Sequence, residues 1–166
     1  RRVLFRSGAR EVVVSPGSRS TPLVLAALRH ADLDVEVVVD ERAAAFFALG
    51  RARVSGRPPV LVRTSGSAGG HDLPAVIEAR AAGWPMVVVT ADRPPELQGA
   101  CAPQTIDQVR LFGAHAVGYF DLGPPSAERL ALRAARRVGV QAATRARAPE
   151  PGAVQVNLPA RKPLEP

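Results

Sequence analysis

The chain is poor in cysteine, in aromatic residues and in long apolar runs, and each shortage excludes a class of protein. Its single cysteine, Cys101, excludes an internal disulfide and a zinc site built from several cysteines. No apolar run approaches the roughly 20 residues that a membrane-spanning helix needs, so we expect no membrane span. A length of 166 residues, with 46% hydrophobic and 22% charged residues, indicates one globular domain.

Side chains that could stack on nucleic-acid bases are also scarce, although the net charge is +7. There are five Phe, one Trp and one Tyr. Among the 22 basic residues only Lys162 is a lysine, and the arginines are scattered, with the densest set spaced as on a helix over 129–147. Nucleic-acid-binding surfaces combine a basic patch with stacking aromatics. We therefore expect no nucleic-acid partner.

The two ends of the chain differ in character from the rest. Residues 1–7, RRVLFRS, resemble the translation of a sequencing adapter, and we expect them to be foreign to the domain; a genuine basic segment is the alternative. Without their three arginines, 19 basic residues face 15 acidic ones. The domain itself is expected over 8–160. The proline-rich stretches 149–152 and 159–166 are typical of a linker, which we expect to begin within 161–166.

Short β-branched runs alternate with alanine-rich stretches along the chain. Several runs are almost continuously apolar, which is typical of strands covered on both faces of a parallel sheet. The alternation predicts right-handed βαβ units and an α/β fold, with a doubly wound, mainly parallel sheet and helices on both faces. Strands are expected at 11–15, 35–39, 60–63, 86–91 and 154–157, and helices at 21–30, 42–54, 70–82 and 126–147, the first and last capped by Thr21 and Ser126.

Polar segments follow the expected strands, at the edge where open parallel sheets bind ligands. SPGSRST, TSGSAGG and ADRPPE each follow a strand, and Asp40 and Glu41 follow another. Arg19 and Arg93 lie in two of these segments, so together they favour a ligand with more than one carboxylate. Further along, Gln104, Asp107 and Gln108 are candidates to line the same mouth.

Each of these segments also has an ordinary structural explanation. An acidic residue at a helix start, such as Glu41, commonly caps the helix or faces its dipole. A turn with a cap explains SPGSRST, and an isolated arginine is usually a solvated charge. Neither glycine-containing segment has Walker or dinucleotide-binding spacing. His71 has no second histidine at ligand spacing, and Ser65 lacks the G-x-S-x-G context of a hydrolase nucleophile.

Taken together, the motifs SPGSRSTPL, DERAAAFFALG, TSGSA with LPAVIEA, ADRPPEL and QTIDQ resemble one family in order and spacing. It is the N-terminal pyrimidine-binding domain of the 2-succinyl-5-enolpyruvyl-6-hydroxy-3-cyclohexene-1-carboxylate synthases of menaquinone biosynthesis. The resemblance runs from about Gly8 to the end. It implies a cytoplasmic homodimer or homotetramer that uses thiamine diphosphate and magnesium. Such an enzyme decarboxylates 2-oxoglutarate and adds the succinyl unit to isochorismate.

The resemblance also implies roles for individual residues. Glu41 matches the glutamate that hydrogen-bonds N1′ of the cofactor aminopyrimidine and thereby promotes removal of the thiazolium C2 proton. The positions near the cofactor are Pro16, Gly17, Glu41, Ser65 and Gly66, and the positions that contact the acidic substrates are Ser18, Arg19, Arg93 and Gln104. The sequence departs from the family at Pro103, His71 and Cys101, where asparagine, asparagine and glycine are usual.

Other parts of the family's active site have no counterpart in this sequence. The diphosphate and magnesium bind a separate C-terminal domain with a GDG…N-type motif, and each site forms between subunits. We therefore expect no metal ligand in this chain and no activity from it alone. Two alternatives stay open: another thiamine-dependent carboligase of the acetohydroxyacid-synthase type, and a non-catalytic anion-binding domain that uses Arg19 and Arg93.

Overall fold

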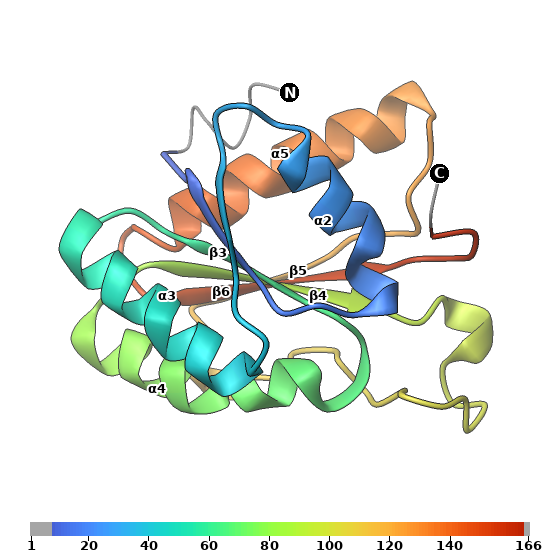
Figure 1. Ribbon diagram of the computed structural model, residues 1–166, viewed down its shortest axis with the longest axis horizontal. Helices are drawn as coiled ribbons and strands as arrows, with labels where there is room; N and C mark the ends of the chain where they lie inside the picture. Colours follow the sequence, from blue (N-terminus) through green and yellow to red (C-terminus); the bar gives the residue numbers. More distant parts are fainter. Residues whose placement is uncertain (1–7, 165–166) are drawn as a thin grey trace.

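The computed structural model describes residues 8–164, which form one sheet of six parallel strands with helices on both faces (Figure 1). The strand order is β2-β1-β3-β4-β6-β5. The strands are β1 (Glu11–Val14), β2 (Asp34–Val37), β3 (Val60–Arg63), β4 (Met86–Asp92), β5 (Gly118–Asp121) and β6 (Ala153–Pro159). The predicted doubly wound α/β fold is confirmed.

The helices form two layers, with α2 and α5 on one face of the sheet and α3 and α4 on the other (Figure 1). The α-helices are α2 (Thr21–Leu28), α3 (Glu41–Ser55), α4 (Leu73–Ala82) and α5 (Arg129–Arg145). Short 3-10 helices are η1 (Ser18–Ser20), η2 (Gly66–Asp72), η3 (Pro95–Leu97) and η4 (Gly113–His115). Within residues 8–164, no helix is long and apolar enough to cross a membrane.

The core consists of two apolar layers, one on each face of the sheet. Successive strand residues point to opposite faces, so in β1 Val13 packs under α3 and α4 while Val12 and Val14 pack under α2 and α5. The helices contribute mostly alanines to these layers, including Ala44 and Ala48 of α3. Small side chains let the helix backbones approach the sheet closely, which fixes where each helix begins at the sheet edge.

One strand was missed from the sequence. The strand β5 has the sequence GYFD, with no β-branched residue, and it pairs only with β6 at the edge of the sheet. The connection from β4 to β5 contains only η3 and η4, so the alternation of strand and α-helix breaks at this point. An edge strand without an apolar run leaves little trace in a periodicity pattern.

Two helices begin later than predicted. Residues 66–72 form η2, so α4 begins at Leu73, because the glycine pair at 69–70 disfavours an α-helix. The helix α5 begins at Arg129, because the Ser126 Oγ accepts the Glu128 N–H in a turn before the helix, at 3.1 Å. Ser126 is therefore not the helix cap.

Two further local predictions are wrong. Thr21 is the first residue of α2 rather than its cap, and no side chain caps this helix; Ser20 occupies the cap position. The stretch 149–152 leads from α5 into β6, so it is an internal loop and not part of a linker. Proline-rich composition marks both kinds of segment equally, which is why the sequence could not separate them.

The last described residues lie against the domain. The Arg161 guanidinium donates to both Glu96 carboxylate oxygens, at 2.7 and 2.9 Å, and Leu164 is buried. The span 8–160 for the domain, the linker at 161–166 and the adapter origin of 1–7 stay predictions. Residues 1–7 and 165–166 lie outside the described residues.

The neighbouring strands β1 and β3 define a switch point in the sheet. From β1 the chain crosses to β2 by way of α2, and from β3 it crosses in the opposite direction to β4 by way of α4, on the other face. Loops at such a point diverge and leave a crevice for a ligand. Gly17, after β1, touches Thr64, after β3, so closely that a Cβ at position 17 would overlap the Thr64 side chain.

We predict that Gly17→Ala lowers the free energy of unfolding by about 1–3 kcal/mol, because overpacking forces the two loops apart. Gly17 has an extended backbone, with φ −173°, that alanine also adopts, so the cost is steric. Gly50 is the matched control: it lies inside α3 with open space around its Cα, and Gly50→Ala should stabilise by about 0.5–1 kcal/mol. Urea unfolding of both variants checks this, and equal effects would contradict it.

Candidate functional site

The predicted site residues lie on loops at the carboxyl edge of the sheet. Pro16 and Gly17 follow β1, Ser65 and Gly66 follow β3, and Glu41 opens α3 just beyond β2. On the other side of the crevice, the remaining predicted residues are Ser18 and Arg19 of η1, Arg93 directly after β4, and Gln104 in the β4–β5 connection. The sheet therefore gathers at one edge residues that are far apart in the sequence.

Glu41 does not cap its own helix. The Asp40 Oδ1 accepts the Ala43 N–H at 2.7 Å, so Asp40 is the N-cap of α3. The Glu41 side chain is half-buried, and no hydrogen bond joins its carboxylate to residues 8–164. The capping role expected of an acidic residue at this helix start therefore belongs to Asp40. The Glu41 carboxylate is left available to a ligand.

A buried ion pair lies beneath the start of α3. Arg63, the last residue of β3, donates through Nε to both Asp72 carboxylate oxygens, at 2.9 and 3.0 Å, and both side chains are fully buried. Its Nη1 donates to the Ser15 Oγ at 3.1 Å and its Nη2 to the Glu41 carbonyl oxygen at 3.4 Å. One guanidinium therefore fixes the end of β1, the end of η2 and the start of α3 relative to one another.

The charge of this pair is linked to the site above it. Burial raises the pKa of the Asp72 carboxyl to about 7, the Arg63 guanidinium opposes this rise, and the Glu41 carboxylate adds to it. Because the charge of Glu41 raises the pKa of Asp72, the buried ion pair and the start of α3 are electrostatically coupled. Sequence analysis missed both residues, although an arginine ending the apolar run VLVR is a signal that could have identified Arg63.

Two hydroxyl groups on the β3 loop are buried without a hydrogen-bond partner. They are the Thr64 Oγ1 and the Ser65 Oγ. Buried polar atoms in native proteins are nearly always paired, so these two hydroxyls mark the β3 loop as a candidate place for a polar ligand.

Two arginines lie on the other side of the crevice. Arg19 is 4% exposed, and its Nη1 donates to the Ala160 carbonyl oxygen at 2.7 Å. The Arg93 Nη2 donates to the Pro103 carbonyl oxygen at 2.9 Å, and the Nε atoms of both arginines have no partner. Burial lowers the pKa of Arg19, the charge of Arg93 lowers it further, and Asp92 opposes both effects. Two neighbouring guanidiniums that repel each other favour an anionic ligand.

The other two predicted substrate residues have different surroundings. Gln104 is exposed and adopts the left-handed backbone region, with φ 56°, and its Nε2 donates to the Ser65 carbonyl oxygen at 3.2 Å. It lies directly on Gly66, where a Cβ would come within 2.9 Å of the Gln104 Cγ. Ser18 is exposed at the start of η1. Gln104 thus bridges the β4–β5 connection and the β3 loop.

Comparison with known families decides which ligand this arrangement serves. Residues 2–111 match the family model described as thiamine pyrophosphate enzyme, N-terminal TPP binding domain. The chain belongs to this family. Thiamine pyrophosphate is another name for thiamine diphosphate.

Several curated relatives of this TPP-binding domain carry one name, 2-succinyl-5-enolpyruvyl-6-hydroxy-3-cyclohexene-1-carboxylate synthase. The protein of Sorangium cellulosum is 56% identical over 165 residues, which is 99% of this chain and 27% of the relative. The protein of Myxococcus xanthus is 54% identical over 164 residues, 98% of this chain and 28% of the relative. The chain therefore spans a little over a quarter of the length of these relatives.

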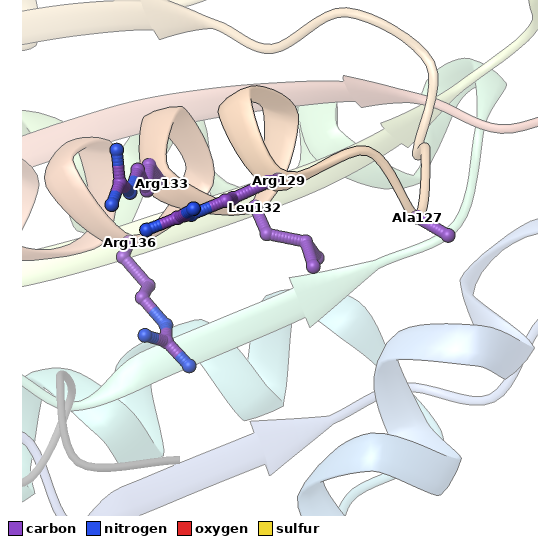
Figure 2. Close-up of a pocket in the computed structure, with 5 residues that line it drawn as sticks. All are labelled: Ala127, Arg129, Leu132, Arg133 and Arg136. Carbon is purple, nitrogen blue, oxygen red and sulfur yellow. The ribbon is translucent and has the colours of Figure 1, made fainter.

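Two other features lie apart from the crevice of the TPP-binding domain. Among residues 8–164, no group of three or more His, Cys, Asp or Glu side chains is placed to hold a metal ion. An open hollow of about 380 Å³ lies on α5, lined by Ala127, Arg129, Leu132, Arg133 and Arg136 (Figure 2). None of the predicted site residues lines it.

We predict that Asp72→Asn in the TPP-binding domain lowers the free energy of unfolding by about 3–5 kcal/mol, because it leaves the buried Arg63 guanidinium uncompensated. The measurement is urea unfolding at about pH 8.5, above the pKa of Asp72. The double variant Arg63→Met with Asp72→Leu removes both charges and should regain most of the loss. A single variant as stable as wild type would contradict this account of the pair.

Proposed function

We propose that this chain is the N-terminal, pyrimidine-binding part of a 2-succinyl-5-enolpyruvyl-6-hydroxy-3-cyclohexene-1-carboxylate synthase. The observation that carries the proposal is the free Glu41 carboxylate at a switch-point crevice with two unpaired buried hydroxyls. The relatives support the choice within the family, because those of Sorangium cellulosum and Myxococcus xanthus bear that name at 56% and 54% identity. The substrates of the intact enzyme are then 2-oxoglutarate and isochorismate.

In this proposal Glu41 holds a proton-sharing hydrogen bond with the aminopyrimidine N1′. Asp40 fixes the first turn of α3, and the Arg63 guanidinium holds the Glu41 backbone from below, so the carboxylate is presented at a defined place. Thiamine diphosphate, when bound, supplies the carbanion-stabilising chemistry that decarboxylation and carbon–carbon bond formation need. The protein's part is to orient the ring and to set the protonation state of its nitrogen.

The loops after β1 and β3 form the cofactor side of the proposed site. Thr64 and Ser65, whose buried hydroxyls have no partner among residues 8–164, lie in the loop that would flank the ring, and Gly66 turns the chain with φ 82°. The contact between Gly17 and Thr64 keeps the two loops together. Pro16 precedes that contact and restricts the turn out of β1.

The arginines form the substrate side of the proposed site. Both 2-oxoglutarate and isochorismate are dicarboxylates, and the Nε atoms of Arg19 and Arg93 have no partner within the described residues. Ser18 adds a hydroxyl at the start of η1. Gln104 would contribute its side-chain amide. It lies against the β3 loop, and its contact with Gly66 holds its main-chain conformation. Bidentate arginine contacts orient a carboxylate as well as binding it.

The intact enzyme in this proposal is a cytoplasmic homodimer or homotetramer in which another part of the protein binds magnesium and the diphosphate. Two large aromatic side chains near Glu41 support self-association: Phe46 and Phe47 of α3 are 44% and 42% exposed. Exposed aromatic residues are enriched at protein interfaces. We expect the 166-residue chain alone to be inactive.

We predict that Glu41→Gln in the complete enzyme lowers the rate of thiazolium C2 proton exchange by about 10²–10⁴-fold, the usual contribution of a positioned acid–base group. Thiamine diphosphate binding should be largely retained, because glutamine keeps the size and most contacts of the side chain. Proton exchange followed by NMR and cofactor binding followed by fluorescence measure the two effects. Glu78→Gln, an exposed change on α4, is the control; unchanged exchange in Glu41→Gln would remove Glu41 from this role.

A carboligase of the acetohydroxyacid-synthase type would differ from the proposed enzyme in its substrates. Turnover of 2-oxoglutarate with isochorismate, and none of pyruvate, is the result we expect of the complete enzyme; turnover of pyruvate alone would favour an acetohydroxyacid-synthase type. Thiamine diphosphate that never binds to the complete protein would favour a non-catalytic anion-binding domain.

We predict that Arg93→Met raises KM for one dicarboxylate substrate by about 10- to 100-fold, as expected for the loss of hydrogen bonds to a charged group. Arg80→Met is the control, because Arg80 is exposed on α4 and pairs with Glu150. Steady-state kinetics with each substrate varied in turn measures the change. Equal KM values in wild type and Arg93→Met would exclude Arg93 from substrate binding.

A further inference from the structure

The peptide unit between Ser65 and Gly66 is held at both of its polar atoms by one short segment. The Gly66 N–H donates to the Gln108 Oε1 at 2.9 Å, and the Ser65 carbonyl oxygen accepts from the Gln104 Nε2 at 3.2 Å. The two glutamines are four residues apart in the β4–β5 connection. The plane of this peptide cannot turn without breaking one of the two hydrogen bonds.

Gln108 also begins a chain of buried hydrogen bonds across the site. Its Nε2 donates to the Asn157 Oδ1 at 3.1 Å, and the Asn157 Nδ2 donates to the Asp92 Oδ2 at 2.9 Å. The Asp92 Oδ1 then accepts the Arg93 N–H at 2.7 Å. Gln108, Asn157 and Asp92 are each at most 2% exposed. The chain therefore links the β3 loop to the backbone of Arg93 through the interior of the sheet edge.

We propose that Gln108 is a positioning residue that fixes the cofactor-side turn, Ser65–Gly66, relative to the substrate-side Arg93. It acts through the Gly66 amide and through Asn157, and it is too deeply buried to serve as a substrate contact itself. The inference rests on the proposed function in one respect only, namely that thiamine diphosphate is the ligand of the turn.

The hydrogen-bond chain demands an amide at position 108. The Thr90 Oγ1 donates to the Asn157 Oδ1 at 2.8 Å while the Asn157 Nδ2 faces Asp92, so the orientation of the Asn157 amide is fixed. Position 108 must therefore accept from Gly66 and donate to Asn157. An ionised glutamate would offer only acceptors there, whereas a protonated glutamate would both accept and donate, as glutamine does.

The test compares Gln108→Glu with Gln108→Met in the complete enzyme, with magnesium present. We expect the dissociation constant for thiamine diphosphate, divided by the wild-type value at the same pH, to rise about tenfold for both variants at about pH 8.5. At about pH 5.5 the ratio for Gln108→Glu should return toward one, because burial raises the pKa of a carboxyl at this position. The ratio for Gln108→Met should stay high.

The pH dependence needs a reference, because other titratable groups surround this position. Asp92 of β4 and Asp121 of β5 bind the Asn157 amide that Gln108 contacts, and Tyr119, Asp107 and Arg110 interact electrostatically in the same region. All of them are present in wild type and in every variant, so the ratio isolates residue 108. Gln155→Met is the control for loss of a neighbouring buried amide: Gln155 is fully buried and donates to the Gln108 carbonyl oxygen at 2.7 Å and to the Thr90 Oγ1 at 3.3 Å, but no hydrogen bond joins it to the Ser65–Gly66 turn. Its ratio should stay near one.

A measurement on the 166-residue chain is independent of thiamine chemistry. Hydrogen exchange by NMR should show a protected Gly66 amide in wild type and in Gln155→Met, and lost protection in Gln108→Met. A wild-type Gly66 amide that exchanges at the unprotected rate overturns the proposal, even if the variants fail to fold. Folded Gln108 variants with unchanged ratios at both pH values also overturn it. A protected Gly66 amide in a complete protein that binds no thiamine diphosphate would instead overturn the proposed function.

Discussion

The site depends on a guanidinium that has no contact with solvent. Arg63 ends β3 and binds Asp72, the Ser15 hydroxyl and the Glu41 carbonyl oxygen. These partners belong to three different segments, the end of β1, the end of η2 and the start of α3, so one side chain joins all three. A buried guanidinium stays charged and needs acceptors on several sides, which forces the three segments to converge on it.

Beyond the Arg63 guanidinium, two kinds of contact hold the loops at the carboxyl edge of the sheet. The loops after β1 and β3, which form the proposed cofactor side, follow their strands directly and pack closely, since Gly17 and Thr64 leave no room for a further carbon atom. The two arginines of the proposed substrate side are held by polar contacts: Arg19 binds the Ala160 carbonyl, and Arg93 binds that of Pro103. Close packing restricts the packed atoms to a narrow range of positions. A side chain that binds a loop carbonyl moves with that loop when the loop changes.

The α/β fold, five of the six strands and the edge that carries the candidate site could be predicted from apolar runs and strand-end loops, because those signals are local. The β5 strand could not, because the sequence GYFD lacks the apolar run that marks a covered strand. Glu41 was found by its family motif, but only the structure shows that Asp40 takes the capping role. The partners of Arg63 and Gln108 are distant in sequence, and no spacing rule identifies such pairs.

The β4–β5 connection lacks an α-helix. It contains positions that can be substituted and positions that the proposed site needs. Three non-glycine residues with positive φ, Cys101, Gln104 and Arg110, lie in it, and Gln108 ties its middle to the sheet through Asn157 and Gln155. New side chains, such as proline at position 103, can therefore be tried in this stretch without disturbing strand pairing or the Arg63 junction. In evolutionary terms, this stretch can diverge only where Gln104 and Gln108 are kept, because both hold the Ser65–Gly66 peptide.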